Sequence, residues 1–144
     1  MTVIIMLEKI NGEMIGIIEL TMMGHRCLKM NAFELYTMIF YVVDLFYDDN
    51  PSAELGAYLG AMSPLTFDNV GSADPAIFEE FKKFINGRKI TLENSFGIAK
   101  EYVKTISYCN IQVAFDNFDE ERWIKGCRKY LSEPHKGADS SAVD

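Results

Sequence analysis

The sequence predicts a mainly α-helical fold, a compact bundle of about five helices with an N-terminal β-hairpin in front of it. Two observations carry this prediction: apolar residues recur at helical spacing from residue 31 onward, and residues that favour helix starts and stops separate these runs. The length of 144 residues, with 49% hydrophobic and 24% charged residues, is typical of one globular domain. We expect a hairpin or N-terminal extension at 1–29, a helical domain at 30–132 and a flexible tail at 133–144.

The β-type pattern lies at residues 3–20, where "VIIMLEKI" and "EMIGIIEL" flank Asn11-Gly12. Asn-Gly favours the type I′ turn of a two-residue hairpin. An isolated hairpin is only marginally stable unless its apolar face packs on something. The alternative interpretation is an appendage or an upstream extension of the gene product, because Met30 stands directly before a sharply defined helix start.

The first expected helix begins at Asn31, which has the spacing of a capping box with Glu34. Apolar residues occupy most sides of the run "AFELYTMIFYVVDLFYDD", which predicts a central helix buried nearly all round. The sequence "DDNP" at 48–51 ends this helix, because proline disfavours helical geometry in the residue before it. Asn50 is expected to cap the next helix, with Pro51 at its first position.

The second and third helices are punctuated in the same way. The second is expected at about 51–62, and "SPLTFDNVGS" after it is a loop. Asp74 is the expected N-cap of the third helix, and Pro75 follows it at the first helical position. The third helix carries an apolar stripe and closes at 86–87, where Asn-Gly favours a left-handed C-terminus.

Two further helices complete the bundle. Thr91 is expected to cap a fourth helix at about 92–107. A fifth is expected at about 119–132, where the acidic opening "DEER" suits the positive end of the helix dipole. Beyond Glu133 the sequence has no apolar spacing, which predicts a frayed tail.

Charge and cysteine content restrict the class of protein. Twenty-one acidic against fourteen basic residues give a net charge of −7, which disfavours nucleic-acid binding because that binding relies on cations that displace counterions. No apolar run is long enough to span a membrane, and no signal peptide is recognisable. Cys27, Cys109 and Cys127 are odd in number and lack a CxxC pair, so we expect a cytoplasmic protein without a disulfide framework.

The sequence contains no constellation typical of an enzyme or a metalloprotein. His25 and Cys27 are two potential metal ligands without a second pair, whereas zinc needs at least three protein ligands. Nucleophilic catalysis needs a positioned base, and His135 lies in the expected tail. Calcium-loop and phosphate-loop motifs do not occur. We therefore expect a non-enzymatic protein without a cofactor or a metal.

The acidic residues are the remaining candidates for function. Most of them fall at expected helix ends, where capping and the helix dipole already account for them. An acidic surface also steers association with a basic protein and repels partners of like charge. The candidate partner-binding residues form two groups in the sequence, Asp48, Asp49, Asp68 and Asp74, and Asp116, Asp119, Glu120 and Glu121.

The segment "FYDDNPSAELGAYLGAMSPLTFDNVGSADPAIFEEFKKFI" at 46–85, together with "CRKYLSEPHKG" at 127–137, resembles small bacterial immunity proteins of polymorphic-toxin and contact-dependent growth inhibition systems. The resemblance implies a non-catalytic inhibitor that binds its cognate toxin and covers an active site or a neighbouring exosite. The expected partner is then a basic toxin protein. The alternative is a helical adaptor or regulatory module that docks a partner helix or peptide in a groove and has no toxin partner.

Overall fold

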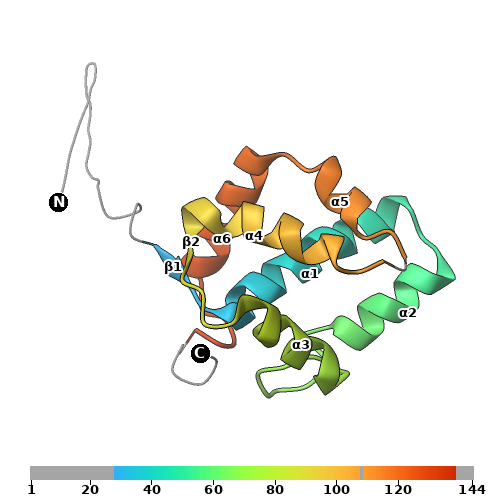
Figure 1. Ribbon diagram of the computed structural model, residues 1–144, viewed down its shortest axis with the longest axis horizontal. Helices are drawn as coiled ribbons and strands as arrows, with labels where there is room; N and C mark the ends of the chain where they lie inside the picture. Colours follow the sequence, from blue (N-terminus) through green and yellow to red (C-terminus); the bar gives the residue numbers. More distant parts are fainter. Residues whose placement is uncertain (1–27, 108, 139–144) are drawn as a thin grey trace. The chain divides into compact units, whose positions relative to one another are not determined.

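The computed structural model describes residues 28–107 and 109–138, and in this part the chain is mainly helical, as predicted (Figure 1). The elements in chain order are β1 (Lys29–Met30), α1 (Ala32–Asp49), α2 (Ala53–Met62), α3 (Pro75–Ile85), β2 (Ile90–Thr91), α4 (Leu92–Lys104), α5 (Gln112–Asp116) and α6 (Glu120–Ser132). The hairpin predicted at 3–20 lies outside the described residues. No described helix has the length and hydropathy needed to cross a lipid bilayer.

The chain divides into two units, Met1–Lys29 with Thr91–Glu93, and Met30–Ile90 with Asn94–Asp144. In the described part of the first unit, the amide of Leu92 donates to the carbonyl of Leu28 at 3.1 Å. The two-residue strands β1 and β2, which the sequence did not predict, pair in a small antiparallel sheet. The second unit contains the candidate surfaces discussed below.

The start of α1 is the predicted capping box. The Asn31 side chain accepts a hydrogen bond from the amide of Glu34 at 2.8 Å. The Glu34 carboxylate in turn accepts from the amide of Asn31 at 2.9 Å. Both groups are buried, so this box replaces water for two backbone donors that the helix itself cannot satisfy.

Burial along α1 differs from the prediction in its second half. Every residue from Ala32 to Phe40 is buried, which agrees with a central helix. Tyr41, Asp44 and Leu45 are exposed, although the helix was expected to be buried nearly all round. The helix ends at Asp49 with Asn50 as C-cap, as "DDNP" predicted. The later helices thus cover the first half of α1 more completely than the second.

The start of α2 was predicted wrongly. The N-cap is Ser52, whose hydroxyl accepts from the amide of Leu55 at 3.1 Å, and the helix begins at Ala53. Asn50 instead closes α1, since its amide donates to the carbonyl of Phe46 at 2.9 Å. Asn50 was expected to be the N-cap of the second helix. Ser52 caps it instead, because the Ser52 side chain reaches the third helical amide.

The start and stop of α3 agree with the sequence. Asp74 is the N-cap, Pro75 occupies the first turn, and Asn86 and Gly87 both have left-handed backbone conformations with φ of 52° and 73°. Helix α4 ends at Lys104, three residues before the predicted end. The short helix α5 was not predicted. Helix α6 spans Glu120–Ser132, within one residue of the predicted 119–132, and Asp119 is its N-cap.

Aromatic side chains join the helices of the second unit. Tyr36 of α1 contacts Phe78 and Phe81 of α3 at ring-centroid distances of 5.2 and 5.3 Å. The buried indole of Trp123 in α6 donates to the Ser95 hydroxyl in α4 at 2.8 Å. Because α1 also contacts α2 and α5, it is the helix around which the unit is assembled.

The described residues of the C-terminal segment form contacts that the sequence analysis did not predict. The predicted flexible tail was 133–144, but residues 135–137 pack against α1 and the α2–α3 loop. The side chain of Asn31 donates to the carbonyl of Gly137 at 2.7 Å. These contacts are polar and come from distant parts of the chain, so apolar spacing could not reveal them.

Replacing Asn31 by alanine removes both the helix cap and the bond to Gly137. We expect Asn31→Ala to lower the free energy of unfolding by about 1–2 kcal/mol, the usual cost of a lost N-cap. The matched control is Gln112→Ala, an exposed position in α5, which should stay within about 0.5 kcal/mol of the natural sequence. Urea denaturation followed by circular dichroism measures both, and equal stability of the two variants would contradict the assigned role of the cap.

Candidate functional site

All eight predicted partner-binding residues lie on the surface, but they do not form one patch. Each of the following is exposed: Asp48, Asp49, Asp68, Asp74, Asp116, Asp119, Glu120 and Glu121. Two of them act as helix caps. A carboxylate oxygen of Asp74 accepts from the amide of Ala76 at 3.1 Å, and one of Asp119 accepts from the amide of Arg122 at 3.2 Å.

The first predicted group is divided between the two ends of α1. Asp48 and Asp49 are at the C-terminal end of this helix. Asp68 belongs to the loop between α2 and α3, and the carbonyl of Phe67 binds Lys136, whose ammonium lies 5.6 Å from the Phe33 ring at the other end. Fifteen residues of helix separate Phe33 from Asp48, a rise of about 22 Å. The second predicted group is local, since it spans the short connection from α5 to α6.

Acidic and basic residues are segregated along the described chain. Residues 30–81, which cover α1, α2, the following loop and half of α3, contain nine Asp or Glu and no Lys or Arg. Of these nine acids, only Glu34 is buried. The described residues of 82–138 contain eleven Lys or Arg against seven Asp or Glu. The acidic residues of the second unit are therefore concentrated in one segment of its sequence, a distribution that the net charge of −7 does not reveal.

The α2–α3 loop combines this acidic character with exposed apolar side chains. Figure 1 shows the loop running from the end of α2 to the start of α3. Leu65 and Phe67 are 55% and 58% exposed, the largest values among the exposed large hydrophobic residues of the described part. Asp68 follows directly. Aromatic side chains are enriched in protein–protein interfaces, so the exposed Phe67 is a candidate contact.

Backbone hydrogen bonds fix both ends of this loop. The amide of Ala73 donates to the carbonyl of Ser63 at 2.9 Å, and the amide of Asp74 donates to that of Ala61 at 2.8 Å. The buried hydroxyl of Ser72 accepts from the amide of Phe78 at 2.9 Å. The loop thus closes on itself and presents Leu65 and Phe67 from a backbone with a defined shape, which lowers the entropy cost of binding.

Lys136 holds the middle of the loop. Its ammonium donates to the carbonyls of Pro64 and Phe67 at 2.5 and 2.6 Å. The same ammonium lies over the ring of Phe33, which adds a cation–π contact. One lysine from the C-terminal segment therefore joins the loop to the first turn of α1.

Gly137 allows the C-terminal segment to approach α1. Its φ is 84°, in the left-handed region that favours glycine. A Cβ atom at this position would lie 2.4 Å from Cδ2 of Phe33. Both the conformation and the space require glycine, and the close approach places the preceding two residues against α1 and the loop.

The partly buried His135 and the buried Glu34 form an ionisable pair beside the loop. Nε2 of His135 lies 2.6 Å from a carboxylate oxygen of Glu34, and the two side chains are 10% and 8% exposed. Nδ1 lies 2.6 Å from the carbonyl oxygen of Glu133. The ring packs on Tyr130 at a centroid distance of 4.2 Å. Both ring nitrogens face acceptors, so the protonated imidazolium, with two N–H donors, satisfies both.

The pKa of His135 reflects this geometry. Burial alone lowers the pKa, but the hydrogen bonds to Glu34 and to the backbone of Glu133 outweigh burial and raise it above 6.5. The histidine therefore has a structural role that joins the C-terminal segment to the cap of α1. The sequence prediction treated His135 as part of a mobile tail.

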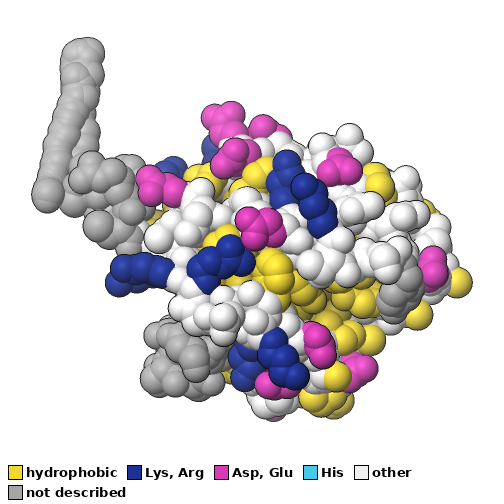
Figure 2. Space-filling model, in the orientation of Figure 1, with side chains coloured by type: hydrophobic (Ala, Val, Ile, Leu, Met, Phe, Trp, Pro, Cys, Tyr) yellow, Lys and Arg dark blue, Asp and Glu magenta, His cyan; other side chains and the backbone are white. Residues whose placement is uncertain are grey.

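Further hollows in the surface are lined by described residues of the second unit. One of them, of about 580 Å³, lies between α2, α3 and α4 and includes Tyr58, Phe84 and Tyr102. Figure 2 shows hydrophobic side chains forming a band over these elements. Burial raises the pKa of Tyr102, which keeps its hydroxyl neutral. This hollow has one carboxylate in its lining, Glu80.

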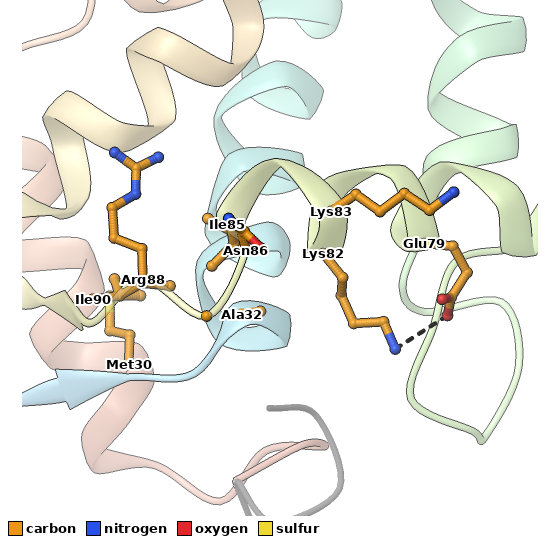
Figure 3. A pocket seen from close by; sticks show the side chains of 10 residues that line it. Met30, Ala32, Glu79, Lys82, Lys83, Ile85, Asn86, Arg88 and Ile90 are labelled. Carbon is orange, nitrogen blue, oxygen red and sulfur yellow. Dashed lines mark ion pairs between the residues drawn. The ribbon is translucent and has the colours of Figure 1, made fainter.

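The second hollow, of about 400 Å³, lies at the C-terminal end of α3 and has cations at its edge. Figure 3 shows that these cations do not converge. Lys82 turns to Glu79, at 3.2 Å, and Arg88 pairs with Glu101, also at 3.2 Å. The side chain of Lys83 extends in a different direction from those of Lys82 and Arg88. The arrangement therefore does not create a common anion site in this hollow.

The described residues contain no cluster of three or more His, Cys, Asp or Glu side chains that could hold a metal ion. His25 and Cys27, which the sequence analysis considered as potential ligands and did not assign to a metal site, lie outside these residues. Cys127 is fully buried, and burial raises the pKa of its thiol to about 12. Burial and the nearby Glu54 also raise the pKa of Cys109. Both thiols stay protonated near neutral pH, which disfavours nucleophilic chemistry at either.

No protein-family model, curated protein or solved structure matches this chain. Among the features of the described surface, the α2–α3 loop with its acidic surroundings is the best-defined candidate for a binding site. We call it the acidic loop and define it as residues 63–74.

The sequence prediction found part of the acidic loop and missed the rest. Asp68 and Asp74 were predicted from charge and helix punctuation. Leu65 and Phe67 were missed because the sequence does not show whether an apolar residue in a loop is buried or exposed. Lys136 was missed because it is distant in sequence. The absence of Lys and Arg from 30–81 is visible in the sequence itself and is the signal that indicates the acidic region.

The link between His135 and Glu34 predicts a pH dependence of stability. Because the folded-state pKa of His135 is raised, its contribution is fully present below the unfolded pKa of about 6.5 and is lost as pH rises through the folded value. We expect the stability difference between the natural sequence and His135→Gln to shrink with rising pH. Urea denaturation from pH 5 to 8 measures this difference. Both proteins contain His25, so its contribution cancels. A difference that grows with pH would refute the assignment.

The anchoring role of Lys136 can be tested without disturbing its apolar stem. Lys136→Met keeps most of the length of the side chain but removes the ammonium that donates to two carbonyls. We therefore expect faster amide hydrogen exchange in the acidic loop. The expected loss of stability is about 1–3 kcal/mol. Lys104→Met, at an exposed position at the end of α4, is the matched control. Unchanged exchange at residues 65–73 in Lys136→Met would show that the loop does not depend on this contact.

Proposed function

We propose that this protein is a non-catalytic immunity protein that binds and neutralises a cognate bacterial toxin through its acidic surface. The observation that carries the proposal is the segment 30–81, with nine acids, eight of them exposed, and no basic residue. Such a surface attracts a cationic protein domain and accelerates its association. The resemblance of 46–85 and 127–137 to immunity proteins supplies the class of partner.

The acidic loop supports the proposal with groups suited to a short-range contact. Long-range charge raises the association rate, whereas residence time depends on a few well-packed side chains. Leu65 and Phe67 are exposed beside Asp68, and hydrogen bonds hold the loop backbone in place. In the proposed complex, these two apolar side chains enter the toxin surface and the surrounding carboxylates face its cations.

The second predicted acidic group has a smaller part in this proposal. Asp119 caps α6, and Glu120 and Glu121 occupy its first turn, where they favour the helix dipole. The following turns of α6 are basic. We therefore place the main toxin contact on the segment 30–81 rather than on this group.

The alternative function is a helical adaptor or regulatory module without a toxin partner. Both functions use an exposed surface and no catalytic chemistry. Affinity purification from the native cell distinguishes them, because an immunity protein recovers one toxin encoded by a neighbouring gene, while an adaptor recovers several unrelated proteins. The proposed site of action is the cytoplasm of the toxin-producing cell.

The direct test is coexpression with the toxin encoded by the adjacent gene. We expect cell growth to recover, and we expect Asp48→Lys/Asp68→Lys to slow association by about tenfold at low salt. Lysine at position 48 suits the C-terminal end of α1, so folding should tolerate this variant. Phe67→Ala should instead accelerate dissociation by about tenfold. Stopped-flow fluorescence measures both rates.

The matched control for the charge reversal is Glu101→Lys/Glu133→Lys, which changes the net charge equally outside the segment 30–81. The control should change the association rate by less than about twofold, and the rates of all variants should converge at high salt. Equal slowing by the two double variants would mean that net charge alone matters. Failure of the natural protein to restore growth would remove the immunity assignment.

A further inference from the structure

A second surface feature lies between α1 and α6, on elements outside the acidic loop. It is a groove of about 320 Å³ with an apolar wall on α1 and a cationic wall on α6. The apolar wall includes Met38, Tyr41 and Leu45, and the cationic wall consists of Arg122, Lys125 and Lys129. We call it the α1–α6 groove.

The apolar wall is a continuous stripe. Met38, Tyr41 and Leu45 follow the i, i+3, i+7 spacing of one helix face. Tyr41 and Leu45 are 37% and 47% exposed, which accounts for the incomplete burial of α1 in its second half. These side chains expose apolar surface that association with a partner would bury.

The floor of the groove is closed and shaped by α6. Trp123 is 1% exposed and lies below the walls. Gly126 has no side chain to fill the space, and a Cβ atom there would lie 3.5 Å from Cε of Met38. The groove is therefore concave, which suits a ridge of side chains from a helix. A flat bilayer surface does not fit it.

The cationic wall has the same periodicity as the apolar wall. Arg122, Lys125 and Lys129 also follow i, i+3, i+7 spacing, and all three are exposed. None of them forms an ion pair with another residue of 28–107 or 109–138. Arg122 lies over the ring of Phe118 at 4.9 Å, which orients its guanidinium. Three cations along one edge attract a partner with carboxylates at matching intervals.

We propose that the α1–α6 groove binds an acidic amphipathic helix from a protein partner. The apolar residues of this helix, at i, i+3 or i+4, and i+7, pack on Met38, Tyr41 and Leu45. Its Asp or Glu residues face Arg122, Lys125 and Lys129. The apolar wall extends from Met38 to Leu45 of α1, a rise of about 10 Å, so two turns of the partner helix fill it.

This binding goes beyond the proposed function. The acidic loop takes a basic partner, whereas the groove takes an acidic one on different helices. Binding at one surface does not require binding at the other.

The test uses three fluorescent helical peptides of about 16 residues and the full chain. The acidic peptide carries leucine at i, i+3 or i+4, and i+7 with flanking glutamates. The second peptide replaces the glutamates by lysine, and the third replaces the leucines by serine. Fluorescence anisotropy should show binding of the acidic peptide at least about tenfold tighter than binding of either control peptide.

Two variants then locate the binding. Lys125→Glu/Lys129→Glu and Leu45→Glu should each weaken binding of the acidic peptide by at least about tenfold. Lys89→Glu/Lys104→Glu, which changes the net charge equally at exposed sites outside the groove, should change it by less than about twofold. Circular dichroism verifies that each variant is folded, which is expected because all of these positions are exposed.

The inference is overturned if the acidic peptide does not bind, if all three peptides bind equally, or if the groove variants and the control variant behave alike. A parallel measurement uses vesicles that contain phosphatidylserine. Vesicle binding that depends on Lys125 and Lys129, without peptide binding, would assign the cationic wall to a membrane surface and reject the helix.

Discussion

The buried carboxylate of Glu34 is the interaction on which the arrangement of this protein depends. One of its oxygens accepts from the amide of Asn31, which starts α1, and the other bonds to His135. A buried carboxylate without such partners is strongly destabilising, so both contacts contribute to the stability of this region. The Glu34 side chain, which completes the capping box of the central helix, thereby also holds His135 in the C-terminal segment. Lys136, the residue after His135, donates hydrogen bonds to the acidic loop.

This arrangement gives the two candidate surfaces different origins. The acidic loop depends on contacts between distant segments, because Lys136 and Gly137 determine where its backbone lies. The α1–α6 groove depends on two helices that are each regular, with a small residue, Gly126, at their crossing. The opposite charges of the two surfaces follow from the segregation of acids into 30–81 and of most cations into the later helices. A protein of net negative charge can therefore present both a negative and a positive binding face.

Local signals predicted the helices well where a side chain bonds to a backbone group within three residues. The capping box of Asn31 and the N-cap at Asp74 belong to this class. The prediction failed at Asn50, where two polar residues compete and the pattern does not show which one caps the helix. It also missed α5, since a helix of five residues has too few apolar positions to show a period.

The sequence by itself determined the helical class, most helix boundaries and the acidic character of residues 30–81, because each depends on neighbours within a turn or on composition. Only the tertiary structure decided that His135 contacts Glu34, that Leu65 and Phe67 are exposed, and that the predicted acids are divided between the ends of α1. These properties depend on contacts such as that between Asn31 and Gly137, which are 106 positions apart. Such contacts form only when the whole unit closes, and no local pattern encodes them.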